Sequence, residues 1–206
     1  METISPSALI NVIEPQQYFG NSKEAERGRK EHTRIIGEMC SGVLPALLAR
    51  AGVREVTKGK KLLVPVSDSL VLSSIPDALS DLGPIELKSG DKLQGKHLLQ
   101  SAIECWVAER VIGKSGDGFV YLFDGKRLTI LRGGGFSHRG EIGELAKIGS
   151  QLISYQDEIG TLNRRKGSDA IKIKYLANKA IKCRQESRFD DRARDLIKQL
   201  SQEAKN

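Results

Sequence analysis

The stretch Ile75-Pro76-Asp77-Ala78-Leu79, followed closely by Ile85-Glu86-Leu87-Lys88, decides the fold that we expect for this chain. Both segments are short and mainly apolar, and Gly83-Pro84 supplies a turn between them, which is typical of two adjacent strands. Because residues i and i+2 of a strand face the same side, Glu86 and Lys88 should project together while their neighbours face the core. The two strands should therefore bring an Asp, a Glu and a Lys into one small volume.

These residue types suit the metal-assisted hydrolysis of phosphodiester bonds. The carboxylates of Asp77 and Glu86 would hold a divalent cation, and Lys88 would position the attacking water or offset charge on the phosphate. The alternative is a cross-strand salt bridge without chemistry, because Glu-x-Lys also occurs by chance in exposed strands. For Lys88 that alternative is an ion pair with Asp77 or Asp91.

The composition indicates one domain with a real core, or one domain with an appendage. The chain has 206 residues, of which 39% are hydrophobic and 29% are charged. We expect no membrane partner and no signal peptide, since no apolar run has transmembrane length and the first residues lack a basic segment followed by an apolar one. The three cysteines are far apart, which favours a reducing, intracellular setting, cytoplasmic or nucleoid-associated.

Hydrophobic periodicity predicts a helix, three strands, a helix, two strands and a helical tail. The first helix should run from Ser22 to about Ala51, with Pro45 bending or dividing it. Strand patterns precede the Asp77 segment at 61–66 and 70–72, and a second helix should span 97–112. Asp124-Gly125 lies between two apolar runs and predicts a hairpin. Only helical patterns follow Gly140.

Four motifs in this order resemble the PD-(D/E)XK nuclease superfamily, and more narrowly its RecB-type exonuclease branch. They are Gly28 to His32, Ile75 to Leu79, Ile85 to Gly90, and His97 to Gln100. The resemblance covers residues 5–131. It implies an α/β (α+β) fold: a restriction-endonuclease-like αβββαβ core with a mixed central sheet flanked by helices over residues 1–138, and a C-terminal basic helical extension over 139–206.

The resemblance also implies a metal site. Asp77 and Glu86 would bind Mg²⁺ or Mn²⁺, the backbone carbonyl of Leu87 would add a ligand, and His32 would be a further ligand from the first helix. A neutral imidazole suits Mn²⁺ better than Mg²⁺. The alternative for His32 is a histidine on a helix surface. Some members of the branch hold an iron–sulfur cluster through four cysteines. This sequence has no counterparts of those cysteines, so we expect no iron–sulfur cluster.

By the same resemblance, Lys88 would orient water or stabilise the phosphate, and Gln100 would hold the site or the scissile strand. The alternative for Gln100 is a helix residue that faces solvent. The sequence departs from the family in two places: Ser74 and Ile75 stand where glycine is common, and Glu104 stands where a tyrosine often follows the glutamine.

The excess positive charge lies in the tail. The chain has a net charge of +7, and residues 163–206 hold 13 Lys and Arg against 6 Asp and Glu, which accounts for all of it. A localised basic segment predicts a polyanionic partner through phosphate contacts that are insensitive to sequence. The alternative is a helical dimerisation element that makes a homo-oligomer. The candidate phosphate-binding residues are Arg164, Arg165, Lys166, Lys172, Lys174, Lys179, Lys182 and Arg184.

Together these features predict a metal-dependent deoxyribonuclease that acts on single strands or ends, with an exonuclease favoured over an endonuclease. Two alternatives stay open at this point. One is a catalytically silent nucleic-acid-binding protein with the same fold, and the other is a helical assembly or adaptor protein in which the charged residues form only salt bridges. DNA is favoured over RNA as the substrate.

Overall fold

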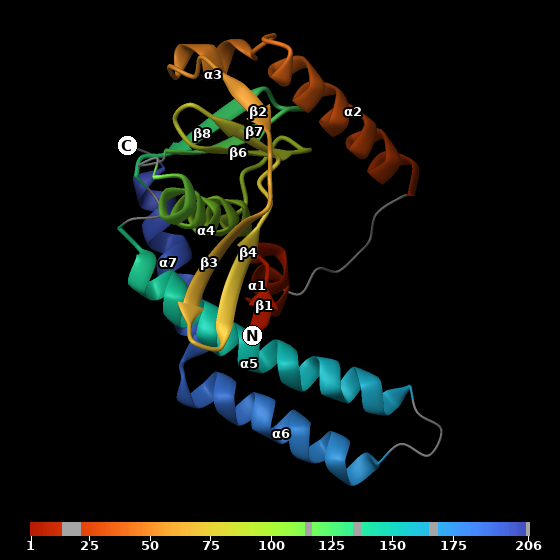
Figure 1. The fold of residues 1–206 in the computed structure, drawn as a ribbon. Helices are drawn as coiled ribbons and strands as arrows, with labels where there is room; N and C mark the ends of the chain where they lie inside the picture. The colour runs from red at the N-terminus through yellow and green to blue at the C-terminus, as the bar shows by residue number, and fades with distance from the viewer. Residues whose placement is uncertain (14–21, 114–116, 134–136, 165–168, 205–206) are drawn as a thin grey trace.

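The computed structural model describes residues 1–13, 22–113, 117–133, 137–164 and 169–204. The described chain is an α+β fold with mixed sheets flanked by helices, as the sequence predicts, but the strands form two sheets where one central sheet was expected (Figure 1). In chain order the elements are β1 (Glu2–Ile4), α1 (Pro6–Ile13), α2 (Ser22–Cys40), α3 (Ala46–Arg50), β2 (Val56–Lys58), β3 (Leu62–Ser67), β4 (Leu70–Ser74), β5 (Ala78–Ser80), β6 (Pro84–Lys88), α4 (Gly95–Ile112), β7 (Gly118–Leu122), β8 (Arg127–Leu131), α5 (Arg139–Asn163), α6 (Ala170–Glu186) and α7 (Phe189–Glu203).

The larger sheet has the strand order β2-β5-β6-β7-β8, and only its β6–β7 pair is parallel. The smaller sheet has the order β1-β4-β3. The chain runs directly from one sheet into the other at residues 59–61 and again at 75–77, so that β2 with β3 and β4 with β5 act as two long bent strands. Counted in this way, α2, the two bent strands, β6, α4 and β7 follow the expected αβββαβ order, and β8 completes the predicted hairpin.

Pro45 divides the helix predicted from Ser22 to Ala51. The helix α2 ends at Cys40, and α3 begins after Pro45, which occupies its N-cap with φ −55° and ψ 136°. A proline has no backbone N–H and disfavours the helical conformation in the residue before it, so one helix cannot continue through this position. Gly52 follows the second helix with a φ of +93°, which glycine adopts without a steric penalty.

Helices cover both faces of the larger sheet. Ile35 and Met39 of α2 and Leu48 of α3 pack in one cluster with Ile85 and Phe119 of the central strands. The helix α4 lies against the opposite face (Figure 1). Alternate residues of β6 therefore face α2 and α3, and those between them face α4, which is the arrangement that a two-residue repeat predicts.

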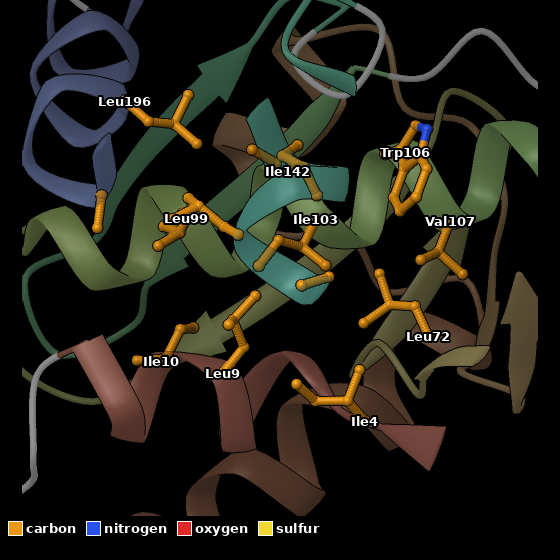
Figure 2. Close-up of a cluster of buried hydrophobic side chains, with 14 of the residues drawn as sticks. Ile4, Leu9, Ile10, Leu72, Leu99, Ile103, Trp106, Val107, Ile142 and Leu196 are labelled. Carbon is orange, nitrogen blue, oxygen red and sulfur yellow. The ribbon is translucent and has the colours of Figure 1, made fainter. Parts of the chain in front are cut away.

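A second cluster joins α1, α4, α5 and α7 to the smaller sheet. Leu9 of α1, Leu72 of β4, and Ile103 and Trp106 of α4 meet there (Figure 2). The strand β1 was not predicted from the sequence. It pairs with β4 in parallel, and three residues are too few to show a repeating pattern.

Helices after residue 139 complete this second cluster. Ile142 of α5 and Leu196 of α7 point into it (Figure 2), and Phe189 is fully buried there. The boundary expected at 138–139 coincides with the start of α5, but side chains from both sides of that boundary share one core. The helix α6 lies outside α5, at the opposite end of the molecule from α2 (Figure 1). None of the helices in the described ranges is long and apolar enough to cross a membrane.

Candidate catalytic site

Asp77 lies in the bend that leads into β5, one residue before the strand in which the sequence placed it. Its carboxylate Oδ2 accepts a hydrogen bond of 2.8 Å from the backbone N–H of Leu87. The regular pairing of β5 with β6 stops at Ala78 and Ile85, so the Asp77 side chain satisfies a strand N–H beyond the end of the ladder. This bond fixes the carboxylate beside β6.

Gly59 allows the bend between β2 and β3 to lie close to the bend that carries Asp77. A Cβ on Gly59 would lie 1.6 Å from the backbone oxygen of Pro76, so only a residue without a side chain fits at this crossing. The Gly59 N–H also points to the Asp77 carbonyl oxygen at 3.3 Å. The bend between β2 and β3 therefore packs directly against the bend that carries Asp77.

Glu86 and Lys88 project from the same face of β6, as predicted, and their side chains form an ion pair. Gln100 of α4 completes the group, because its Oε1 accepts from Lys88 Nζ at 3.0 Å and its Nε2 donates to Glu86 Oε1. The alternative in which Gln100 faces solvent is therefore wrong. The amide contacts both charged groups and holds them in one arrangement.

His32 reaches the same place from α2. Its Nε2 lies 3.0 Å from Asp77 Oδ2, and about 30% of its side chain is exposed. The hydrogen bond to Asp77 raises the pKa of His32, against the opposing effect of partial burial. The side chain therefore belongs to the site and is not an unattached surface histidine. A neutral imidazole could serve as a metal ligand, and a protonated one as an ion-pair partner of Asp77.

Glu104 is a site residue that the sequence reasoning missed. It lies one helical turn after Gln100, is 2% exposed, and its Oε1 accepts a 3.0 Å hydrogen bond from Gln100 Nε2. Its other oxygen, Oε2, has no hydrogen-bond partner among the described residues, and neither has Oε2 of Glu86. The sequence did hold a signal for Glu104. It is a glutamate in the apolar middle of a helix, and it follows a candidate site glutamine by four residues.

The two glutamates of the site, Glu86 and Glu104, are buried, and this changes their ionisation. Burial, and then the charge of Asp77, raise the pKa of Glu86. Burial and the charge of Glu86 raise the pKa of Glu104 well above its ordinary value. Burial acts to lower the pKa of Lys88, but the Glu86 carboxylate outweighs it and the pKa is raised. Three carboxyl groups thus surround one ammonium group and one imidazole, an arrangement that favours additional positive charge.

The described residues contain no group of three or more His, Cys, Asp or Glu side chains arranged to hold a metal ion. The reason is visible in the contacts: Asp77 pairs with His32, while Glu86 turns to Lys88 and Gln100. The donor types still fit a hard divalent cation, since carboxylate oxygens predominate and one buried oxygen of Glu86 has no partner. The metal site expected from Asp77, Glu86, Leu87 and His32 therefore stays a prediction.

Two clefts flank α2 next to these residues. One has a volume of about 610 Å³ and lies toward the end of β6 and the β7–β8 turn. The other has a volume of about 490 Å³ and reaches His32 and Asp77. The lining residues of the first are Arg27, Gly28, Glu31, Ser89, Gly90, Phe123 and Asp124. Those of the second are His32, Thr33, Ile36, Gly37, Cys40, Lys58, Gly59, Ile75, Pro76 and Asp77.

Among the residues that the structure describes, the candidate phosphate-binding residues of the tail do not reach the site. Most of them lie on α6, at the far end of the molecule (Figure 1). Lys172 pairs with Glu158 at 2.7 Å, and Lys182 Nζ lies 3.6 Å from Glu186. Arg164 and Lys174 are exposed, whereas Arg165 and Lys166 lie outside the described residues.

Two other basic residues of α6 have local partners. Lys179 lies over the ring of Tyr175, with 4.9 Å from Nζ to the ring centre. Arg184 binds Asp190 at 2.8 Å and the backbone carbonyl of Val12, so it ties α6 to α7 and α1. The guanidinium of Arg184 therefore has a structural task, and nucleic-acid binding by the remaining residues stays a prediction.

Comparison with known proteins adds little to this picture. No family model matches the sequence, and no curated protein matches it. A solved structure titled "Crystal structure of SSO0001" superposes with a TM-score of 0.45 and 14% sequence identity, covering 74% of this chain and 77% of its own. A similarity of this size carries no argument about function.

Proposed function

We propose that the chain is a divalent-metal-dependent nuclease that hydrolyses phosphodiester bonds in DNA. The observation that carries this proposal is the convergence of His32, Asp77, Glu86, Lys88 and Gln100 from α2, the bend before β5, β6 and α4. A simple surface salt bridge would not need a buried glutamate, an amide that contacts both partners, and a second buried carboxyl group behind them.

A divalent cation suits the charge of this site. Asp77 and Glu86 would hold Mg²⁺ or Mn²⁺, and the imidazole of His32 stands beside them as a further donor. The bound cation would supply Lewis-acid polarisation of the phosphate and a lowered pKa for bound water. It would also offset the excess of carboxyl groups that raises the pKa values of Glu86 and Glu104.

Lys88 acts as a fixed positive charge in this proposal. Its raised pKa keeps the ammonium group protonated near neutral pH, so it suits stabilisation of charge that develops on the phosphate and does not suit proton abstraction. Gln100 holds the ammonium group at 3.0 Å and also contacts Glu86, so the lysine and the carboxylate keep a constant separation. Glu104 fixes the amide of Gln100 from the other side.

The experiment that tests the proposal measures cleavage of labelled single- and double-stranded DNA and RNA with Mg²⁺, Mn²⁺ or EDTA. We expect cleavage by the natural chain in either metal, none in EDTA, and a loss of at least about 100-fold in Glu86→Gln and in Lys88→Met. Glu144→Gln and Lys147→Met are matched controls, because this pair is exposed on α5 and joined by a 3.4 Å ion pair. Both controls should cleave normally.

Two results would contradict the proposal in different ways. Salt-sensitive DNA binding without cleavage in any metal would identify a catalytically silent nucleic-acid-binding protein. The absence of both binding and cleavage, together with self-association through the C-terminal helices, would identify an assembly protein.

A further inference from the structure

We infer that the 490 Å³ cleft between α2 and the two strand bends is a binding pocket for an unpaired nucleobase of the substrate strand. This inference deepens the proposed function and rests on it. The α2 side of the pocket is one helical face, formed by His32, Thr33, Ile36, Gly37 and Cys40. The opposite side comes from residues 58–59 and 75–77, the two bends that position Asp77.

The walls of the pocket have the chemistry that a flat aromatic ring prefers. Ile36, Ile75 and Pro76 present apolar surface, and Ile75 is 63% exposed at the rim. Enzymes that handle single bases seat them between apolar or aromatic side chains, and a volume of about 490 Å³ suits one small ligand.

The position of the pocket specifies which base it would hold. His32 and Asp77 belong both to its lining and to the candidate catalytic site. A base seated here would therefore be part of a nucleotide next to the scissile phosphate. Lys58 also lines the pocket, is exposed, and forms no ion pair with any carboxylate among the described residues, so its charge is available to a phosphate of the same strand.

Gly37 keeps the pocket open. A glycine in the middle of a helix costs about 0.5–1 kcal/mol relative to alanine. A Cβ on Gly37 would meet nothing within 4 Å, so close packing does not require this glycine. Gly143 of α5 also has free space around it, but Gly37 differs because it forms part of a pocket wall. A side chain at Gly37 would project into the volume that the base would occupy.

The pocket gives the nuclease a reason to prefer single strands. A base that is stacked and paired in a duplex cannot enter it unless the duplex opens, which costs a few kcal/mol.

The test fills the pocket and removes the base separately. Gly37→Leu should raise KM for a labelled single-stranded oligonucleotide roughly 10-fold, because one stacked base contributes about 1–3 kcal/mol. The matched control Gly143→Leu places the same side chain on another helix with free space and should leave KM unchanged. Ile75→Ala removes apolar surface at the exposed rim, so it should raise KM without lowering the free energy of unfolding.

Oligonucleotides with one abasic residue, placed in turn at each position, supply the second half of the test. The natural chain should lose about 10-fold in kcat/KM at one position next to the cleaved bond. Gly37→Leu should show no such position, because it has already lost the contact. Equal cleavage by the natural chain, Gly37→Leu and Ile75→Ala, with a flat abasic series, would overturn the inference while the nuclease proposal stands.

Binding measurements separate this inference from a failure of the nuclease proposal. If no oligonucleotide is cleaved, fluorescence anisotropy with the same single strand still compares the natural chain with Gly37→Leu. A 10-fold weaker Kd in the variant would support the base pocket in a protein that does not hydrolyse DNA. An unchanged Kd would overturn the pocket as well.

Discussion

Replacing Gly59 with alanine should both destabilise the fold and displace Asp77. The new Cβ would lie 1.6 Å from the backbone oxygen of Pro76 and 2.7 Å from its carbonyl carbon, whereas contacts below 3.0 Å essentially do not occur. Both atoms belong to the backbone, so no flexible side chain can move away and relieve the clash. The bend at residues 75–77 must shift as a whole, and Asp77 shifts with it.

The cost can be worked from the contacts. Overpacking a closely packed site costs typically about 1–3 kcal/mol. Loss of the 3.3 Å hydrogen bond from Gly59 to the Asp77 carbonyl adds about 1 kcal/mol. The reduced freedom of the unfolded chain returns about 0.4–1 kcal/mol. The net loss should be about 1–3.5 kcal/mol in the free energy of unfolding. A displacement of about 1 Å at Asp77 should cost roughly 100-fold in the rate of cleavage.

Urea unfolding and DNA cleavage measure the two effects on one protein preparation. Gly143→Ala is the matched control, because its Cβ has free space and it lies within α5. It should raise the free energy of unfolding by up to about 1 kcal/mol. If Gly59→Ala unfolds within 0.5 kcal/mol of the natural chain (roughly the scatter of neutral substitutions), then the crossing does not position Asp77 and the reasoning is refuted.

Three further predictions concern stability. Phe189→Ala should cost about 3–5 kcal/mol in urea unfolding, because Phe189 is fully buried in the cluster shared by α4, α5 and α7; a cost under 1 kcal/mol would show that the C-terminal helices form a separate appendage. Burial, and then the charge of Lys88, lower the pKa of His97 to about 4, so stability is present above pH 6.5 and is lost as the pH falls toward 4. His97 is buried, so the loss is on the order of 3 kcal/mol, and it should shrink in His97→Gln when unfolding is measured at both ends of this range. Burial raises the pKa of Glu104, so the natural chain loses stability as the pH rises above 4.5. Without metal, the free energy of unfolding of Glu104→Gln should therefore exceed that of the natural chain by more at pH 9 than at pH 5. A pH-independent difference would contradict this.

Local patterns in the sequence predicted most of the elements, because they depend on neighbouring residues. The two-residue repeat of β6 placed Glu86 and Lys88 on one face, and the structure confirms it through their ion pair. The Asp124-Gly125 turn predicted the β7–β8 hairpin correctly. The order of four short motifs also placed His32 and Gln100 near the acids, where the structure has them.

Other features depended on contacts between distant residues, and no local pattern could reveal them. In the sequence, Glu104 is one polar residue within a helix. Its role becomes evident only from its contacts with Gln100 and Glu86 in the structure. The close approach of Gly59 to Pro76 is likewise a property of two bends that cross in space. The sequence predicted phosphate contacts by the basic residues of α6, but only the fold shows that this helix lies at the opposite end of the molecule from α2 (Figure 1).

The sequence by itself determined which side chains share a strand face or a helix turn, because backbone geometry has a fixed repeat. The tertiary structure alone decided which of those faces meet, how deeply the acids are buried, and that a pocket opens beside Asp77. Burial and approach depend on how whole elements pack, and the pKa values of Glu86, Lys88 and Glu104 follow from that packing and not from the residues next to them in the chain.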